Sequence, residues 1–69
     1  RMITCEFFTL SRGRYRVMAT AAKMARGAMA RYAITAGIDR PEELKGFDSL
    51  GYRFSPERST GQIYRFYQQ

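Results

Sequence analysis

The chain lacks histidine and tryptophan, and its 69 residues include one cysteine and two prolines. Without histidine, the usual side chain for acid–base catalysis near neutral pH is missing. Cys5 cannot form an internal disulfide and has no histidine with which to make a nucleophile–base pair. Glu42 and Glu43 are adjacent, a pattern typical of a helix start rather than of a metal site. We therefore predict no catalytic residue, no metal and no cofactor, and a protein that is not an enzyme.

Long apolar runs are also missing. Residues 2–10 fall short of the roughly 20 residues that a membrane helix needs, and they contain Glu6. The sequence therefore predicts no membrane association. Because there is no disulfide framework, it predicts a cytoplasmic protein in the reducing interior of a host cell. A length of 69 residues with 45% hydrophobic content is typical of a single domain, residues 1–69.

Positive charge is abundant and unevenly distributed. The net charge is +6, from twelve Lys and Arg against six Asp and Glu. Seven of the twelve cations fall within residues 1–38, where Glu6 is the single acid, and residues 39–69 are balanced. This asymmetry indicates a polyanionic partner, which is nucleic acid, a nucleoprotein complex or an acidic protein surface. The alternative is a soluble basic protein without such a partner.

Periodicity and turn residues predict the order of the elements. In chain order these are strands over residues 2–10 and 14–18, a helix over 21–36, one short helical turn over 39–46, and strands over 51–54 and 62–68. Arg12 and Gly13 form the predicted turn of the first hairpin. Thr20 is the expected N-cap of the helix and Gly37 its expected C-terminal stop.

These elements predict an α+β fold. We expect a β-β-α-β-β order, an antiparallel sheet and one main helix packed on one face, with the strand order left open. A two-residue hairpin loop pairs Leu10 with Tyr15 and Phe8 with Val17, and these four side chains are expected to face the core. The residues expected to be largely buried are Tyr15, Val17, Met24, Ala28, Tyr32, Tyr52, Phe54, Tyr64 and Phe66.

The outer side of the predicted helix is the first candidate binding surface. Lys23, Arg26 and Arg31 fall there without an acid, and Gly27 lies among them. Glycine in a helix interior costs about 0.8–1.0 kcal/mol relative to alanine. A partner that approaches closely would explain this cost, and the alternative is an ordinary solvated face.

The tip of the first hairpin is a second cluster of positive charge. Arg12, Arg14 and Arg16 alternate with other residues there, and guanidinium groups pair with phosphates and stack on bases. The alternative is that they protect a sheet edge from aggregation. Because the hairpin leads directly into the helix, we expect the arginines of the hairpin and the cations of the helix to form one contact surface.

The outer face of the sheet is a secondary candidate. Phe7, Arg53, Arg65 and Tyr67 are expected to share it. Aromatic and arginine side chains on an open sheet face are typical of a stacking platform or a protein-binding hot spot. The alternative is self-association through this face, which would make a homodimer.

The stretch "RGRYRVMATAAKMARGAMARYA" is followed by the late hairpin "YRFSPERSTGQIYRF". In topology and size this pattern resembles small phage and mobile-element proteins of the anti-CRISPR type. The resemblance implies a non-enzymatic phage protein that inhibits a Cas nucleoprotein complex by contacting an acidic Cas surface, guide RNA or captured DNA. Two alternatives are a directly DNA- or RNA-binding regulatory protein and a small ribonuclease toxin that uses Arg, Tyr and Glu57.

Overall fold

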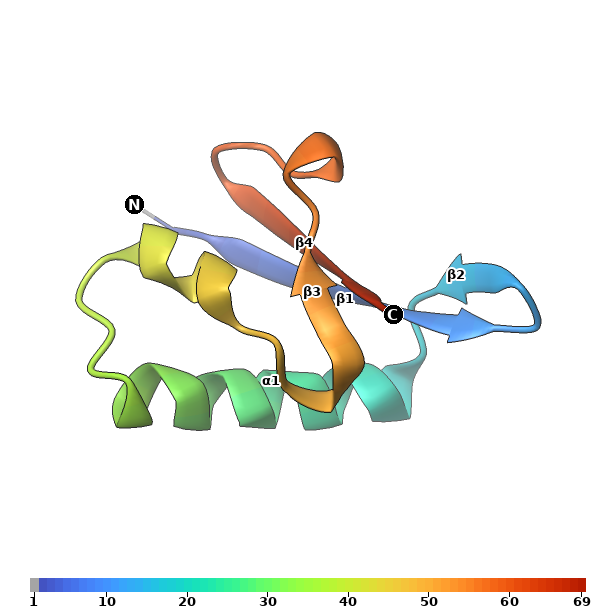
Figure 1. Ribbon diagram of the computed structural model, residues 1–69, viewed down its shortest axis with the longest axis horizontal. Helices are drawn as coiled ribbons and strands as arrows, with labels where there is room; N and C mark the ends of the chain where they lie inside the picture. The colour runs from blue at the N-terminus through green and yellow to red at the C-terminus, as the bar shows by residue number, and fades with distance from the viewer. Residues whose placement is uncertain (1) are drawn as a thin grey trace.

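Four short strands and one long helix account for the regular structure of residues 2–69, which are the residues that the computed structural model describes. The elements are β1 (Thr4–Ser11), β2 (Arg14–Arg16), α1 (Ala19–Thr35), β3 (Tyr52–Phe54) and β4 (Ile63–Gln68), with short 3-10 turns at η1 (Pro41–Gly46), η2 (Ser49–Gly51) and η3 (Pro56–Arg58). The helix lies along one face of the sheet (Figure 1). The predicted α+β class, the element order and the helix on one face are confirmed.

The first hairpin turns as its sequence predicts. Arg12 and Gly13 both have positive φ, at 52° and 77°, as the favoured two-residue hairpin turn requires. Leu10 therefore lies opposite Tyr15. Strand β2 ends at Arg16, so the predicted pair of Phe8 with Val17 does not form, and Phe8 instead lies beside Tyr67 of β4.

The sheet has the strand order β2-β1-β4-β3 and is mixed. Strands β3 and β4 form the predicted antiparallel hairpin, in which Phe54 lies opposite Phe66. Strand β4 then pairs with β1 in parallel, with Phe7 beside Phe66. This pairing corrects the expectation of an antiparallel sheet throughout. A parallel pair needs a long crossover connection, and the segment that contains α1 provides one.

Aromatic rings fill the space between sheet and helix. Phe7 is 2% exposed and lies within 5.8 Å, between ring centroids, of Phe47, Tyr52 and Phe66. The hydroxyl of Tyr52 is 2.7 Å from the Thr9 hydroxyl, so it has a hydrogen-bond partner. The core cluster comprises Phe7, Ala25, Ala28, Met29, Phe47, Tyr52, Tyr64 and Phe66, with Tyr32 and Phe54 packed against it. The predicted burial of the aromatic residues of β3 and β4 is thus confirmed.

Five expectations about the core, and one about the outer face, are wrong: Leu10 is 44% exposed, and Phe8 lies beside Tyr67 on the outer face. Tyr15 is 42% exposed, and Val17 and Met24 are each 59% exposed. Phe7, expected on the outer face, is buried. Residues paired across two strands share a face, so the pairing with Phe66 turns Phe7 toward the core and leaves Phe8 and Tyr15 outside.

Helix α1 begins and ends through backbone geometry. Its N-cap is Met18, without a side-chain cap, rather than Thr20. At the other end Gly37 has a φ of 64°, and the N–H groups of Gly37 and Ile38 donate to the carbonyls of Ile34 and Ala33. This is the Schellman arrangement of a helix that ends at glycine. Small side chains, among them Ala22 and Ala25, let the helix lie close to the sheet.

Candidate contact surfaces

The cations of α1 form an exposed group, here called the basic helix surface: Lys23, Arg26 and Arg31. None of these three makes an ion pair with another described residue. Gly27 lies among them, and a side chain added there would meet the Arg31 guanidinium nitrogen at 3.8 Å and nothing closer. The guanidinium of Arg31 thus lies beside Gly27, where the helix carries no side chain. This arrangement suits close approach of a broad anionic surface.

The first hairpin, which carries three arginines, lies beyond the N-terminal end of α1 (Figure 1). Arg12, Arg14 and Arg16 are all exposed. Arg16 pairs with Thr9, whose hydroxyl contacts the core residue Tyr52, so Arg16 lies on the helix side of the hairpin. Lys23 and Arg31 are about 12 Å apart along the helix axis. Because the hairpin lies at the N-terminal end of α1, it is nearer to Lys23 than to Arg31. A single surface made of both groups stays a prediction.

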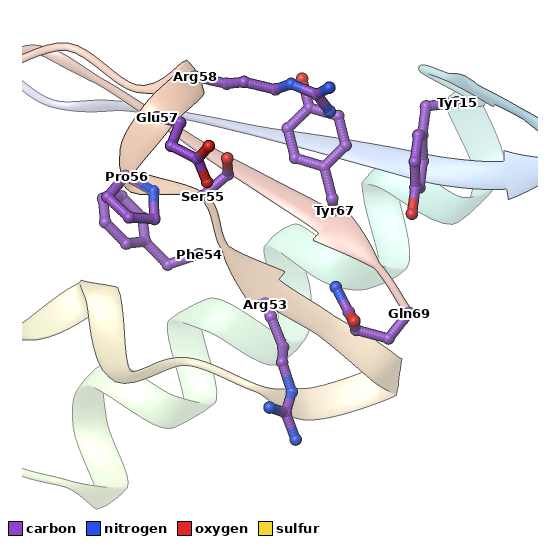
Figure 2. A pocket seen from close by; sticks show the side chains of 9 residues that line it. All are labelled: Tyr15, Arg53, Phe54, Ser55, Pro56, Glu57, Arg58, Tyr67 and Gln69. Carbon is purple, nitrogen blue, oxygen red and sulfur yellow. The ribbon is translucent and has the colours of Figure 1, made fainter.

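The opposite face of the sheet carries a row of rings, here called the aromatic row: Phe8, Tyr67 and Tyr15. Phe8 stacks on Tyr67 with centroids 4.7 Å apart and an interplanar angle of 8°. Tyr15 meets Tyr67 edge-on at 5.0 Å. The Arg58 guanidinium lies 4.8 Å from the centroid of the Tyr67 ring, as Figure 2 shows. Tyr67 is therefore held by contacts from two other strands and from η3.

A hollow of about 310 Å³ borders the aromatic row, with Tyr15, Arg58 and Tyr67 in its wall (Figure 2). Arg53 also lines it, but its side chain points away from the Tyr67 ring. Arg65 lies beside the row, where its Nε donates to Glu6 Oε1 at 2.8 Å and its Nη1 donates to the Arg58 carbonyl at 2.6 Å. The hollow is open and polar, and of the two arginines that line it Arg58 lies against the Tyr67 ring.

The structure thus places three of the four residues predicted for the outer sheet face on it: Arg53, Arg65 and Tyr67. The fourth, Phe7, belongs to the core. Sequence reasoning missed Phe8, Tyr15 and Arg58 on this face. Arg58 lies in the short connection between β3 and β4. Because these strands form a hairpin, the connection must stay close to them, and this could have indicated that Arg58 lies near β4. The placement of Phe8 depends on the β1–β4 pairing, for which the sequence carries no local signal.

Cys5 packs against the core from β1. Burial raises the pKa of its thiol above the usual value, so the thiolate is disfavoured at neutral pH. No group of three or more potential metal-ligating side chains occurs within residues 2–69. No helix in the same range is long and apolar enough to cross a membrane.

Comparison with known proteins assigns the chain to a family. A family model described as "Peroxide stress protein YaaA" matches residues 1–58. The chain belongs to the YaaA family. Bacterial relatives of this kind include a UPF0246 protein of Lactobacillus johnsonii, which is 50% identical over 66 residues, and one of Phenylobacterium zucineum, which is 46% identical over 65 residues.

These YaaA-family matches cover nearly all of this chain but little of the relatives. The Lactobacillus johnsonii match spans 96% of the chain and 26% of the relative, and the Phenylobacterium zucineum match spans 94% and 24%. A UPF0246 protein of Paraburkholderia phytofirmans is 49% identical over 94% of the chain and 25% of its own length. The chain therefore spans about a quarter of the length of the curated relatives it matches.

Membership in the YaaA family overturns the anti-CRISPR resemblance. The matches are to bacterial UPF0246 proteins across nearly the whole chain, whereas the resemblance to phage inhibitors depended on size and topology alone. The expectation of a phage-encoded inhibitor of a Cas complex is wrong. The regulatory-protein and ribonuclease-toxin alternatives gain no support from these matches.

Proposed function

We propose that this chain is a non-catalytic part of a longer peroxide stress protein of the YaaA family, to which it contributes a contact surface. The observation that carries this proposal is the match of residues 1–58 to the family model. The short coverage of the relatives supports a role within a longer polypeptide. We place that protein in the bacterial cytoplasm.

The state of Cys5 supports a role other than direct reaction with peroxide. A peroxide-reactive cysteine reacts as the thiolate, and such sites have a lowered pKa and an exposed sulfur. The pKa of Cys5 is raised by burial, and the side chain packs against the core. In this proposal Cys5 is a packing residue.

The basic helix surface is the part of the chain that we propose to meet a partner. The sequence has a net charge of +6, and Lys23, Arg26 and Arg31 are exposed on α1. Exposed cations without intramolecular partners attract a negatively charged surface and accelerate its association. We therefore propose an anionic partner for this surface.

Survival of hydrogen peroxide tests the proposal. A bacterial strain that lacks its YaaA-family gene is complemented with a family-length gene carrying this segment, either unmodified or as one of four variants. The triple change of Lys23, Arg26 and Arg31 to Ala should reduce survival toward that of the deletion strain. Cys5→Ala should leave survival unchanged. Alanine is the best helix former, so the triple variant is expected to stay folded.

Arg40→Ala is the matched control for a single Arg26→Ala change, because Arg40 is exposed and outside the basic helix surface. Arg26→Ala should reduce survival more than Arg40→Ala does. The proposal fails if the triple variant protects as well as the unmodified gene, or if Cys5→Ala abolishes protection at normal protein levels. If the triple variant loses protection, the partner is identified by pull-down with the unmodified protein in the presence and absence of nuclease. Retention of the partner after nuclease treatment indicates an acidic protein, and its loss indicates nucleic acid.

A further inference from the structure

The face of the sheet opposite α1 is uncovered within residues 2–69 (Figure 1). The central strands β1 and β4 are parallel, from the pair Thr4 and Ile63 to the pair Phe8 and Tyr67. All-parallel sheets occur almost only with both faces covered, and in this mixed sheet the central pair is parallel. The topology is therefore compatible with a second layer over the central strands, which the described residues do not themselves supply.

The uncovered face has the composition of a packing surface. The aromatic row lies along it, and Leu10 extends the row at the edge, with 44% of its surface exposed beside Tyr15 at 42%. The rings hold one another through stacked and edge-on contacts. Rigid aromatic side chains bury a large area and lose little conformational freedom when they are covered.

Two of the arginines on this face have partners inside the segment, and the third, Arg53, points away from the Tyr67 ring. Arg65 pairs with Glu6 at 2.8 Å, and Arg58 lies against the Tyr67 ring. The basic helix surface differs, because its cations have no ion-pair partner among the described residues. An anionic partner is thus better matched by the helix side, and an apolar protein layer by the sheet side.

We propose that the aromatic row is the surface on which the rest of a YaaA-family polypeptide packs. The relatives are about four times as long as the matched segment, so they contain ample chain for such a layer. This inference rests on the proposed function only in taking the chain as part of a longer protein. It does not depend on a role in peroxide stress.

Thermal stability of a family-length protein tests this inference. In the Lactobacillus johnsonii relative, the 66 aligned residues are replaced by this chain to make a chimera. Tyr15→Lys should lower the Tm of the chimera by at least about 5 °C, because it places a charge beneath the covering layer. Ile34→Lys is the matched control, since Ile34 is an exposed large apolar residue on the other side of the molecule, at 82%. It should leave the Tm unchanged.

The same substitutions are also made in the isolated 69-residue chain. This comparison distinguishes contacts within the segment from contacts with the remainder of the YaaA-family polypeptide. There Tyr15→Lys loses only its edge-on contact with Tyr67, so it should lower the Tm by less than it does in the chimera, and Ile34→Lys should leave the Tm unchanged. A fall in Tm for Tyr15→Lys that is no larger in the chimera than in the isolated chain would overturn the inference. So would a dimer of the isolated chain that Tyr15→Lys dissociates, because the face would then belong to a second copy. Peroxide survival of the charge variants is measured separately, so either proposal can fail alone.

If the chimera does not accumulate, the chain and the remainder of the relative are co-expressed as two polypeptides. Co-purification of the unmodified chain and of Ile34→Lys, with loss of Tyr15→Lys, supports the inference. Equal co-purification of all three, or of none of them, contradicts it.

Discussion

At the scale of single residues, the neighbouring residues Phe7 and Phe8 lie on opposite faces of the sheet. The two rings must point to opposite faces because strand side chains alternate. Phe7 enters the core beside Phe66, and Phe8 stacks on Tyr67 outside it. Of these two adjacent residues, one therefore contributes its ring to the core and the other to the surface.

Phe66 is the residue whose truncation should cost most. It is fully buried and its ring lies near those of Phe7, Phe47 and Phe54. Phe66→Ala should lower the free energy of unfolding by about 3–5 kcal/mol, enough to unfold a small domain of ordinary stability. Circular dichroism during urea titration measures this.

Ile34→Ala is the control for that truncation. Ile34 is 82% exposed, so removing its side chain should change the free energy of unfolding by less than about 0.5 kcal/mol. Equal losses for Phe66→Ala and Ile34→Ala would contradict the observed core.

At the scale of elements, α1 shows how two glycines can serve opposite purposes. Gly27 lies inside the helix in an ordinary helical conformation, with room for a side chain. Gly37 follows the helix with a φ of 64°, which side chains other than that of glycine adopt at a cost. One glycine weakens the helix and the other ends it.

Replacing each glycine with alanine should therefore change stability in opposite directions. Gly27→Ala should raise the free energy of unfolding by about 0.8–1.0 kcal/mol, from helix propensity. Gly37→Ala should lower it by about 1–2 kcal/mol, from the left-handed backbone conformation. Denaturant unfolding of the two variants side by side measures both changes. A loss of stability in Gly27→Ala would mean that the glycine is needed for packing.

At the scale of the whole molecule, the fold depends on joining its two ends. Strand β4 lies in the interior of the sheet, between β1 from the start of the chain and β3. The Arg65–Glu6 ion pair and the Phe7–Phe66 contact also join these ends.

A chain that ends at residue 61 tests this dependence. It lacks β4, including Tyr64 and Phe66 of the core. It should show no cooperative thermal transition, whereas the complete 69-residue chain should show one. A truncated chain that still melts cooperatively would show that the β1–β4 pairing is dispensable.

The sequence by itself determined the parts of this protein that depend on neighbouring residues. The Arg12-Gly13 turn, the stop at Gly37, the short turn after Pro41 and the late hairpin all follow from local backbone preferences and spacing. The exposure of Lys23, Arg26 and Arg31 follows in the same way from helical periodicity. Comparison of the sequence with known proteins established membership in the YaaA family, whereas size and topology alone resembled a different class, the anti-CRISPR inhibitors.

Only the tertiary structure decided which face of the first hairpin is buried. Alternation separates Phe7 from Phe8 but does not rank them, since both are aromatic. The parallel pairing with β4, which joins Phe7 to a residue 59 positions later in the sequence, makes the choice. It also moves Tyr15 to the surface and gathers Phe8, Tyr67 and Arg58 there. A pairing of this kind depends on the free energy of the whole core, which no local pattern contains.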